Sequence, residues 1–259
     1  MNQIFFKANG FETKRSQPKL SNVEELIPNY EYDAYGHWVF ETSSASLVDK
    51  VNNKTLTLQS GAAYPPVYSS VGVTISTAVG NALVSDLSDT STQSITLAAV
   101  VRCSSTALAI LLGNLVPSTS TTSSGLSAFS SDGKGYLTVK PVTANSLAGI
   151  SSLTPPVGHN QTSNFFIAIS VDKTTKKGII YVKQNTSEST NEATYTASSY
   201  QTSSNKYAVG NSVYTTTNNL ANTATFAEAV IFNKALTLVE IQALAGRSKE
   251  RMDNRGISL

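Results

Sequence analysis

The sequence is poor in several residue types that carry chemistry. It has one cysteine, two histidines and one tryptophan among 259 residues, and only 14% of its residues are charged, against about 25% in average proteins. A single cysteine excludes an internal disulfide, and Cys103 stands in the apolar run 95–103, which predicts a buried, inert thiol. His37 and His159 lack a second ligand at a metal-binding spacing, so zinc chemistry is not expected.

Strong net charge and long apolar runs are missing as well. The net charge is +2, so we expect no nucleic-acid partner. No window approaches the roughly 18 apolar residues of a membrane span, so we expect no membrane partner. Residues 1–15 lack the apolar stretch of a signal peptide. We therefore expect synthesis in a cytoplasm, with cell lysis as the way out.

Serine and threonine take the place of charge and make up 66 of the 259 residues. Thr favours strands and Ser favours turns, so this excess predicts many short strands joined by polar loops. From Trp38 onward, apolar runs and apolar–polar alternation indicate such strands. The predicted strands are 37–41, 55–59, 71–75, 94–102, 107–113, 126–129, 135–140, 164–172, 178–183, 193–197, 206–210 and 224–232.

Turn signals separate these strands. Asp132-Gly133 predicts a hairpin turn before the strand at 135–140. Polar tracts at 117–125, 151–163 and 184–192 predict longer surface loops.

One late segment carries a helix pattern. Within residues 235–246, Thr237 and Glu240 are spaced as a capping box, and Gly246 is the predicted end of the helix. Many strands followed by one helix predict an all-β fold: a two-sheet antiparallel jelly-roll sandwich with one short C-terminal helix.

We expect three parts along the chain: an N-terminal extension at 1–33, the β-sandwich at 34–246 and a basic tail at 247–259. The extension mixes charges and prolines without a sustained period. This pattern favours a segment that anchors the protein to a partner and that is itself dispensable for folding. The tail carries four basic residues broken up by Glu250 and Asp253. Two interpretations stay open for it: the solvated face of a helix, or a docking surface for an acidic partner.

Several segments, in their order along the chain, resemble the concanavalin A-like lectin/glucanase superfamily and especially its laminin-G-like branch. Trp38-Val-Phe40 is similar to its opening strand, and 167–172 with 179–183 to its central hairpin. The most specific likeness is the closing strand 227–233 with the helix start at 236–241. The resemblance covers roughly 37–246. Where the family has Asn-Gly after the second hairpin strand, this chain has Lys183-Gln-Asn185, which predicts a longer or different loop.

The resemblance implies roles for a few residues. Trp38 is either a sugar-stacking platform or part of the core, and its place in the opening strand favours the core. The family often holds one calcium ion at the sandwich rim, for which Asp86, Asp89 and the region of Asp49 are candidates. The alternative is that these are solvated or turn-capping carboxylates. With so few clustered acids we expect no cofactor.

Catalysis is not expected. Glucanases of this superfamily carry Glu-x-Asp-x-x-Glu on one strand, which places their carboxylates on one face beside the scissile bond. The nearest match, Glu31-Tyr-Asp33, lacks the third carboxylate and precedes the sandwich. There is also no Gly-x-Ser-x-Gly nucleophile motif. No catalytic or metal-binding residue is predicted.

The candidate binding residues are tyrosines, because aromatic faces beside Asn or Ser suit carbohydrate and protein surfaces. Those in or near loops and polar strands are Tyr64, Tyr68, Tyr195, Tyr200 and Tyr214.

The favoured function is a non-catalytic surface protein of a tailed-phage virion, either a tail or fibre subunit or a capsid-decoration subunit. Its lectin-like domain would bind a host-surface glycan or a protein, and the extension would bind other virion proteins. We expect a homo-oligomer or part of a larger assembly. The Ser-, Thr- and Asn-rich, weakly charged composition is typical of such proteins. The alternatives are a glycan-cleaving enzyme on the same fold and an intracellular carbohydrate-binding module.

Overall fold

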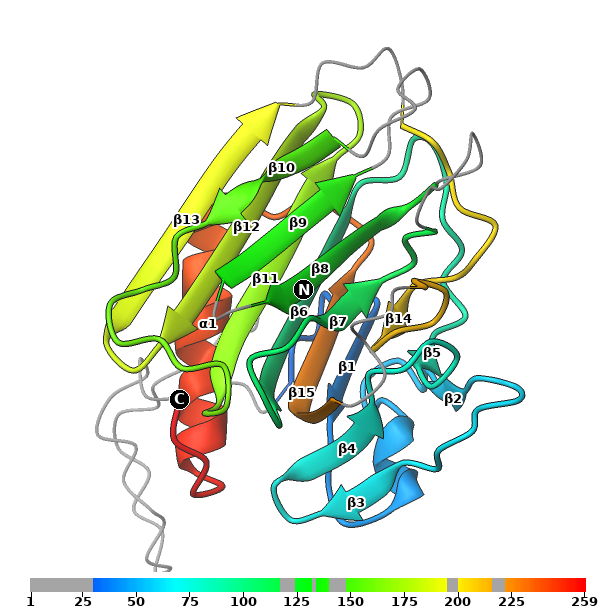
Figure 1. Ribbon diagram of the computed structural model, residues 1–259, viewed down its shortest axis with the longest axis vertical. Coiled ribbons are helices and arrows are strands. Elements are labelled where there is room, and N and C mark those ends of the chain that lie inside the picture. The colour runs from blue at the N-terminus through cyan, green and yellow to red at the C-terminus, as the bar shows by residue number, and fades with distance from the viewer. Residues whose placement is uncertain (1–29, 117–123, 132–133, 140–147, 195–199, 216–221) are drawn as a thin grey trace, which may run out of the picture.

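The chain folds into two antiparallel β-sheets packed face to face, with one helix behind them (Figure 1). The computed structural model describes residues 30–116, 124–131, 134–139, 148–194, 200–215 and 222–259. The eight-stranded back sheet has the order β13-β12-β11-β6-β15-β4-β3, with β1 also paired to β15. The seven-stranded front sheet has the order β10-β9-β8-β7-β14-β5-β2. This architecture confirms the predicted two-sheet sandwich.

The back sheet consists of β1 (Gly36–Val39), β3 (Val67–Ser69), β4 (Gly72–Ser76), β6 (Ile95–Cys103), β11 (Phe165–Asp172), β12 (Lys177–Gln184), β13 (Ser187–Thr194) and β15 (Thr223–Phe232). The front sheet consists of β2 (Thr57–Leu58), β5 (Leu83–Val84), β7 (Ala109–Gly113), β8 (Leu126–Ser131), β9 (Lys134–Val139), β10 (Ala148–Leu153) and β14 (Ala208–Val209). The helical elements are η2 (Ser44–Leu47), a 3₁₀ turn, and α1 (Leu238–Asp253).

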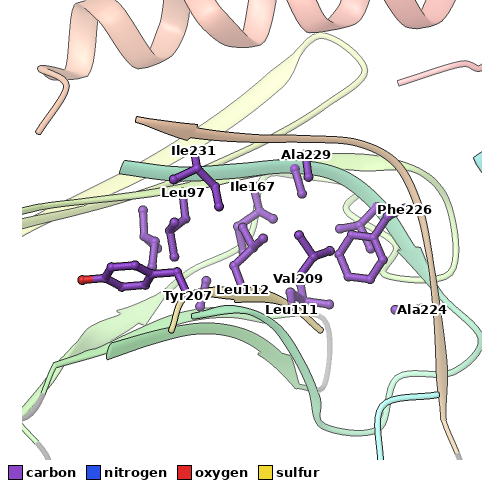
Figure 2. Packing of buried hydrophobic residues seen from close by; sticks show 14 of the residues in the cluster. Leu97, Leu111, Leu112, Ile167, Tyr207, Val209, Ala224, Phe226, Ala229 and Ile231 are labelled. Carbon is purple, nitrogen blue, oxygen red and sulfur yellow. The ribbon is translucent and has the colours of Figure 1, made fainter. Parts of the chain in front are cut away.

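The main core lies between the two sheets. Side chains from both sheets point toward one another in Figure 2, among them Leu97, Ile167, Ala229 and Ile231 opposite Leu111, Leu112 and Val209. Trp38 is 1% exposed, and its Nε1 donates a hydrogen bond to the carbonyl oxygen of Lys54 at 3.0 Å. The expected core role of Trp38 is therefore confirmed. Cys103 is also buried, and burial raises the pKa of its thiol to about 12, as expected of an inert cysteine.

A second core lies on the other face of the back sheet. There, Ala98 and Val100 of β6 pack with Ile241 and Leu244 of α1. Because successive side chains of a strand point to opposite faces, a sheet buried on both sides needs apolar residues at every position. This explains why β6 is apolar almost throughout. Within the described ranges, no helix is long and apolar enough to cross a membrane.

Helix α1 begins as predicted but ends later. The Thr237 hydroxyl accepts from the N–H of Glu240, and the Glu240 side chain accepts from the N–H of Thr237, which completes the capping box. The predicted end at Gly246 is wrong, because the helix continues to Asp253. Residues beyond the glycine, such as Met252, are buried against the sheet. This burial outweighs the weak helix propensity of one glycine, about 1 kcal/mol relative to alanine.

The polar tract 184–192 is not a loop. Most of it is strand β13, which pairs with β12 from Gln184 opposite Ser187. The connection is a two-residue turn, so the expectation of a longer loop is wrong. Asn185 takes φ 54° in this turn, a conformation that asparagine adopts more readily than most residues. The side chains of β13 alternate between half-buried and exposed, but both sets are mostly polar, and the sequence therefore hides the strand period.

Other predicted segments agree more closely. The β8–β9 hairpin is present, with Ser131 opposite Lys134, although the turn at 132–133 lies outside the described residues. Most of the predicted loop at 117–125 and most of the predicted strand at 193–197 also lie outside the described residues. The sequence prediction omitted four strands, namely β3, β5, β10 and β13. Of these, β10 occupies the start of the predicted loop at 151–163.

The arginines of the predicted basic tail are mostly not solvated. Glu31, 4% exposed, accepts hydrogen bonds from Arg247 at 2.9 and 2.7 Å and from Arg251 at 2.8 Å. Arg251 also donates to buried Glu228 at 2.7 Å, and Nε2 of His37 lies 2.7 Å from the same carboxylate oxygen. Because Nδ1 of His37 accepts the N–H of Glu31, the ring proton is assigned to Nε2. This buried ion-pair network joins α1, β15 and the segment before β1.

Further along, Arg255 donates to the carbonyl oxygens of Phe40, Ala227 and Ser70. Both interpretations of the tail, a solvated face and a docking surface, are therefore wrong for Arg247, Arg251 and Arg255. The predicted three-part division stays a prediction, but α1 crosses the boundary at 246/247, and Glu31 belongs to the network of the sandwich. The predicted anchor lies almost entirely in residues 1–29, outside the described residues.

Candidate functional site: a polar groove on the front sheet

A groove of about 420 Å³ lies at the β2 end of the front sheet. Thr57 of β2 and Val84 of β5 are opposite one another in register and both line it. Their neighbours Leu58 and Leu83 pack against the main core. Because strand side chains alternate between faces, Thr57 and Val84 form a floor on the outer face of the sheet.

The walls of the groove come from three separate stretches of chain. One is the loop 204–206, which contributes Asn205 and Lys206. The others are residues 212–213, after β14, and residues 85–86, after β5. Apart from Leu58 and the two valines, every lining residue is polar or charged. The groove therefore suits a ligand rich in hydrogen-bonding groups.

Gln59 lines this groove and carries a buried, unsatisfied acceptor. Its Nε2 donates to the carbonyl oxygen of Ser212 at 3.0 Å, which fixes the orientation of the amide. Its Oε1 is buried and has no hydrogen-bond partner among the described residues. A buried acceptor left unpaired costs about 1–3 kcal/mol.

Asp86 supplies the carboxylate of the groove, and its side chain is 57% exposed. The hydroxyl of Tyr35 donates to Oδ1, and Nζ of Lys54 lies 3.6 Å from Oδ2. Nζ of Lys54 also lies 4.7 Å from the centre of the Tyr35 ring, a cation–π distance. These two residues orient Asp86 while its exposed part stays accessible to a ligand.

A buried charged cluster lies behind the loop wall. Nζ of Lys173, with a side chain 0% exposed, lies 2.6 Å from Oδ1 of Asp89 and 4.1 Å from the centre of the Tyr200 ring. The hydroxyls of Tyr207 and Tyr200 donate to Oδ1 and Oδ2 of Asp89, each at 2.6 Å. Burial lowers the pKa of Lys173 although Asp89 opposes this. Burial, together with Asp89, raises the pKa values of both tyrosines well above 10.0.

The Asp89 cluster holds the groove wall in place. Asp89 accepts the N–H of Ser203 at 2.9 Å, and the Ser203 hydroxyl donates to the carbonyl oxygen of Asn114 at 3.1 Å. The Asn114 side chain in turn donates to the carbonyl oxygen of Asn205 at 2.9 Å. The loop that carries Asn205 and Lys206 is thus hydrogen-bonded to residues packed within the sandwich. A wall fixed in this way costs little entropy when a ligand binds.

The four predicted tyrosines that lie within the described residues do not line this groove. Tyr200 is 4% exposed and hydrogen-bonded to Asp89, which corrects its assignment to a binding surface. Tyr64 is 55% exposed, while Tyr68 on β3 and Tyr214 are half-buried. A binding role for these three stays a prediction. Tyr195 lies outside the described residues.

Most of the groove residues were missed by the sequence analysis. Gln59, Asn205 and Lys206 belong to residue types found on any polar surface, and they are far apart in the chain. Only Asp86 stood out beforehand, as a candidate calcium ligand.

The carboxylates considered for metal binding or catalysis have other partners. Asp49 caps a turn, accepting from the N–H groups of Val51 at 3.1 Å and Asn52 at 2.6 Å. Asp89 is paired with Lys173, and Asp33 lies 2.7 Å from Nζ of Lys234. Among the described residues, no three His, Cys, Asp or Glu side chains gather as metal ligands.

Comparison with known proteins defines the fold but not a family. No protein-family model and no curated protein matches the sequence. Among solved structures, the binding domain of botulinum neurotoxin serotype D has a TM-score of 0.53 at 12% identity, covering 84% of this chain and 51% of that chain. A botulinum neurotoxin DC binding domain in complex with rat synaptotagmin II gives 0.55 at 13% identity, covering 83% and 51%. The DC domain in complex with SialylT gives 0.54 at 14% identity, covering 81% and 50%.

The chain thus spans about half the length of these toxin domains. At such low identity the likeness establishes the fold alone, which is a two-sheet jelly-roll sandwich. The narrower resemblance to the laminin-G-like branch stays a prediction.

Proposed function

We propose that this protein is a non-catalytic, lectin-like domain that binds a glycan in the groove of the front sheet. The observation that carries the proposal is the lining of this groove, in which every residue except Leu58, Val84 and Val213 is polar or charged. Asp86 adds a partly exposed acceptor, and Asn205 and Lys206 add donors. Sugar hydroxyls both donate and accept, so a groove that offers both kinds of group matches them.

Binding is favoured over cleavage by the carboxylates of the groove. Glycoside hydrolysis ordinarily needs two carboxyl groups that flank the scissile bond. Of the described residues that line this groove, only Asp86 carries one. The buried pair Glu31 and Glu228 lies elsewhere and is already bound by Arg251.

The test is an array of bacterial surface polysaccharides, probed with wild-type protein and two tryptophan variants. Thr57→Trp adds a large side chain on the exposed floor of the groove and should abolish the binding of neutral polysaccharides by filling it. Thr190→Trp makes the same change at an exposed position on β13, an edge strand of the back sheet, and should leave binding unchanged. Equal binding by all three proteins would place the glycan elsewhere and overturn the assignment of the groove. A blank array for the wild type would favour a protein ligand.

For the biological setting, we infer a surface subunit of a tailed-phage virion, in the tail, the fibre or the capsid decoration. The support is the composition, with 66 Ser and Thr residues and 14% charged residues, combined with a lectin-like fold suited to an exposed particle surface. Assembly through the N-terminal extension and a homo-oligomeric state belong to the same inference. Mass spectrometry of purified virions is the test, and absence of this polypeptide from them would refute the setting without bearing on the groove.

A further inference from the structure

A second groove, of about 370 Å³, lies where β6 and β12 end, beside the loop that leads into β11. It shares no lining residue with the groove of the front sheet. Its lining includes amide and hydroxyl side chains and one charged residue, Arg102, with no acidic side chain. The charged side chains of the two grooves therefore differ, since the first groove contains a carboxylate and an ammonium and the second contains a guanidinium.

Arg102 is an unpaired cation in this groove. Its neighbours on β6, Val101 and Cys103, face the main core, so strand alternation turns Arg102 to the outer face of the back sheet. It is exposed and, among the described residues, has no hydrogen bond or ion pair. Arg247, Arg251 and Arg255 all have such partners. The five N–H donors of Arg102 thus remain available for a ligand.

The surroundings of Arg102 are held in place by a buried amide. Gln184 is 3% exposed, donates to the carbonyl oxygens of Asn160 at 3.0 Å and Asn164 at 2.9 Å, and accepts the N–H of Asn160 at 2.7 Å. The Asn164 side chain donates to the carbonyl oxygen of Ser258 at 3.1 Å. The loop and the chain segment that line the groove are therefore fixed without using Arg102.

Two amides in the same groove add further donors. Oδ1 of Asn160 accepts from the N–H and the hydroxyl of Thr162, while its Nδ2 has no partner among the described residues. The side chain of Asn185, in the β12–β13 turn, is likewise without one in the described part of the chain. A planar guanidinium beside amide donors matches a carboxylate, which it can bind through two parallel hydrogen bonds.

We propose that this second groove binds the carboxylate of an acidic sugar through Arg102, with the amides of Asn160 and Asn185 bound to neighbouring ring oxygens. The site goes beyond the proposed function, because it is a separate site for a different chemical class of glycan. The protein would then bind two segments of a surface polysaccharide, one by its hydroxyls and one by its acid group.

The test is an NMR titration of the wild-type protein with methyl β-glucuronide, methyl β-glucoside and glucose 6-sulfate as separate probes. The glucuronide should shift the amide signals of Asn160 and Asn185 in a saturable way, and the glucoside should bind at least tenfold more weakly. Added salt should weaken the glucuronide complex, because the contact is between charges near the surface.

Variants of Arg102 make the test specific. Arg102→Gln should reduce glucuronide affinity at least tenfold, and Arg102→Lys should recover only part of it, because an ammonium cannot form the two-pronged contact. Both variants should keep the melting temperature of the wild type, because Arg102 is exposed and unpaired. Thr57→Trp should bind glucuronide normally, which separates this site from the groove of the front sheet. Equal affinity for glucuronide and glucoside, preference for the sulfate, or unchanged binding by Arg102→Gln would overturn the proposal.

Discussion

Lys173→Met perturbs the buried cluster behind the groove wall. The change removes a cation whose Nζ lies 2.6 Å from Asp89, with both side chains 0% exposed. Breaking a buried ion pair by removing one partner costs about 3–5 kcal/mol, because the other charge stays buried. The hydroxyls of Tyr200 and Tyr207 still donate to Asp89, so we expect the lower end, about 3 kcal/mol. In a chain of this size about 1 kcal/mol corresponds to roughly 2–4 °C, and the melting temperature should fall by about 10 °C.

The assay is urea unfolding and thermal melting of the wild type, Lys173→Met and the control Lys249→Met. On α1, Nζ of Lys249 lies 2.5 Å from Oδ2 of Asp253, but the two side chains are 38% and 45% exposed. Such surface pairs contribute about 0–1 kcal/mol, so the control should melt within about 3 °C of the wild type. If Lys173→Met lowered the melting temperature by no more than the control does, the cluster would not be the buried ion pair that its geometry indicates, and it would not support the groove wall.

Three further predictions concern other parts of the sandwich. Burial raises the pKa of Glu228, but the hydrogen bond from His37 and the charge of Arg251 outweigh this and hold the pKa at about 2, below the usual 4.5. The ionised carboxylate therefore stabilises the folded state above pH 4.5, and this stabilisation is lost as pH falls toward about 2. Urea unfolding over that pH interval should therefore show a flatter acid dependence for Glu228→Gln, and an unchanged slope would contradict the assignment. The buried Cys103 thiol, with its pKa raised to about 12, should react with a chromogenic disulfide at pH 8 only after urea unfolding, and rapid labelling of the native protein would show that the thiol is accessible. Because Asn185 has φ 54°, the protein should tolerate Asn185→Gly, whereas Asn185→Val should lower the free energy of unfolding by about 1–2 kcal/mol in the same assay. Equal stability of the two variants would argue against the tight turn.

The fold could be predicted from sequence because its strongest signals are apolar. The runs that became β6 and β11 are buried on both faces, and their composition alone predicted strands. Strand β13 could not be found in this way, because its half-buried and exposed positions are both mostly polar. The helix end was misplaced because Gly246 is a local signal, whereas the burial of Met252 beyond it depends on the sheet.

The candidate sites could hardly be predicted, for a reason that lies in the topology. The first groove combines residues 55–60, 84–86, 204–206 and 212–213, which meet only through the order of the strands in the front sheet. Burial also separates residues that look alike in the sequence. Tyr200 and Tyr64 are both loop tyrosines, but the first is enclosed around Asp89 and the second is exposed. Arg102 and Arg251 differ in the same way, one being unpaired and the other buried between two carboxylates.

The central claim is that the groove of the front sheet binds a glycan. Its most direct test is a calorimetric titration of the wild type and Thr57→Trp with a neutral oligosaccharide, free of carboxylates, that the array selects. We predict saturable binding at one site in the wild type and no measurable heat of binding in the filled groove of Thr57→Trp, at an unchanged melting temperature. Undiminished binding by the folded Thr57→Trp protein would contradict the claim.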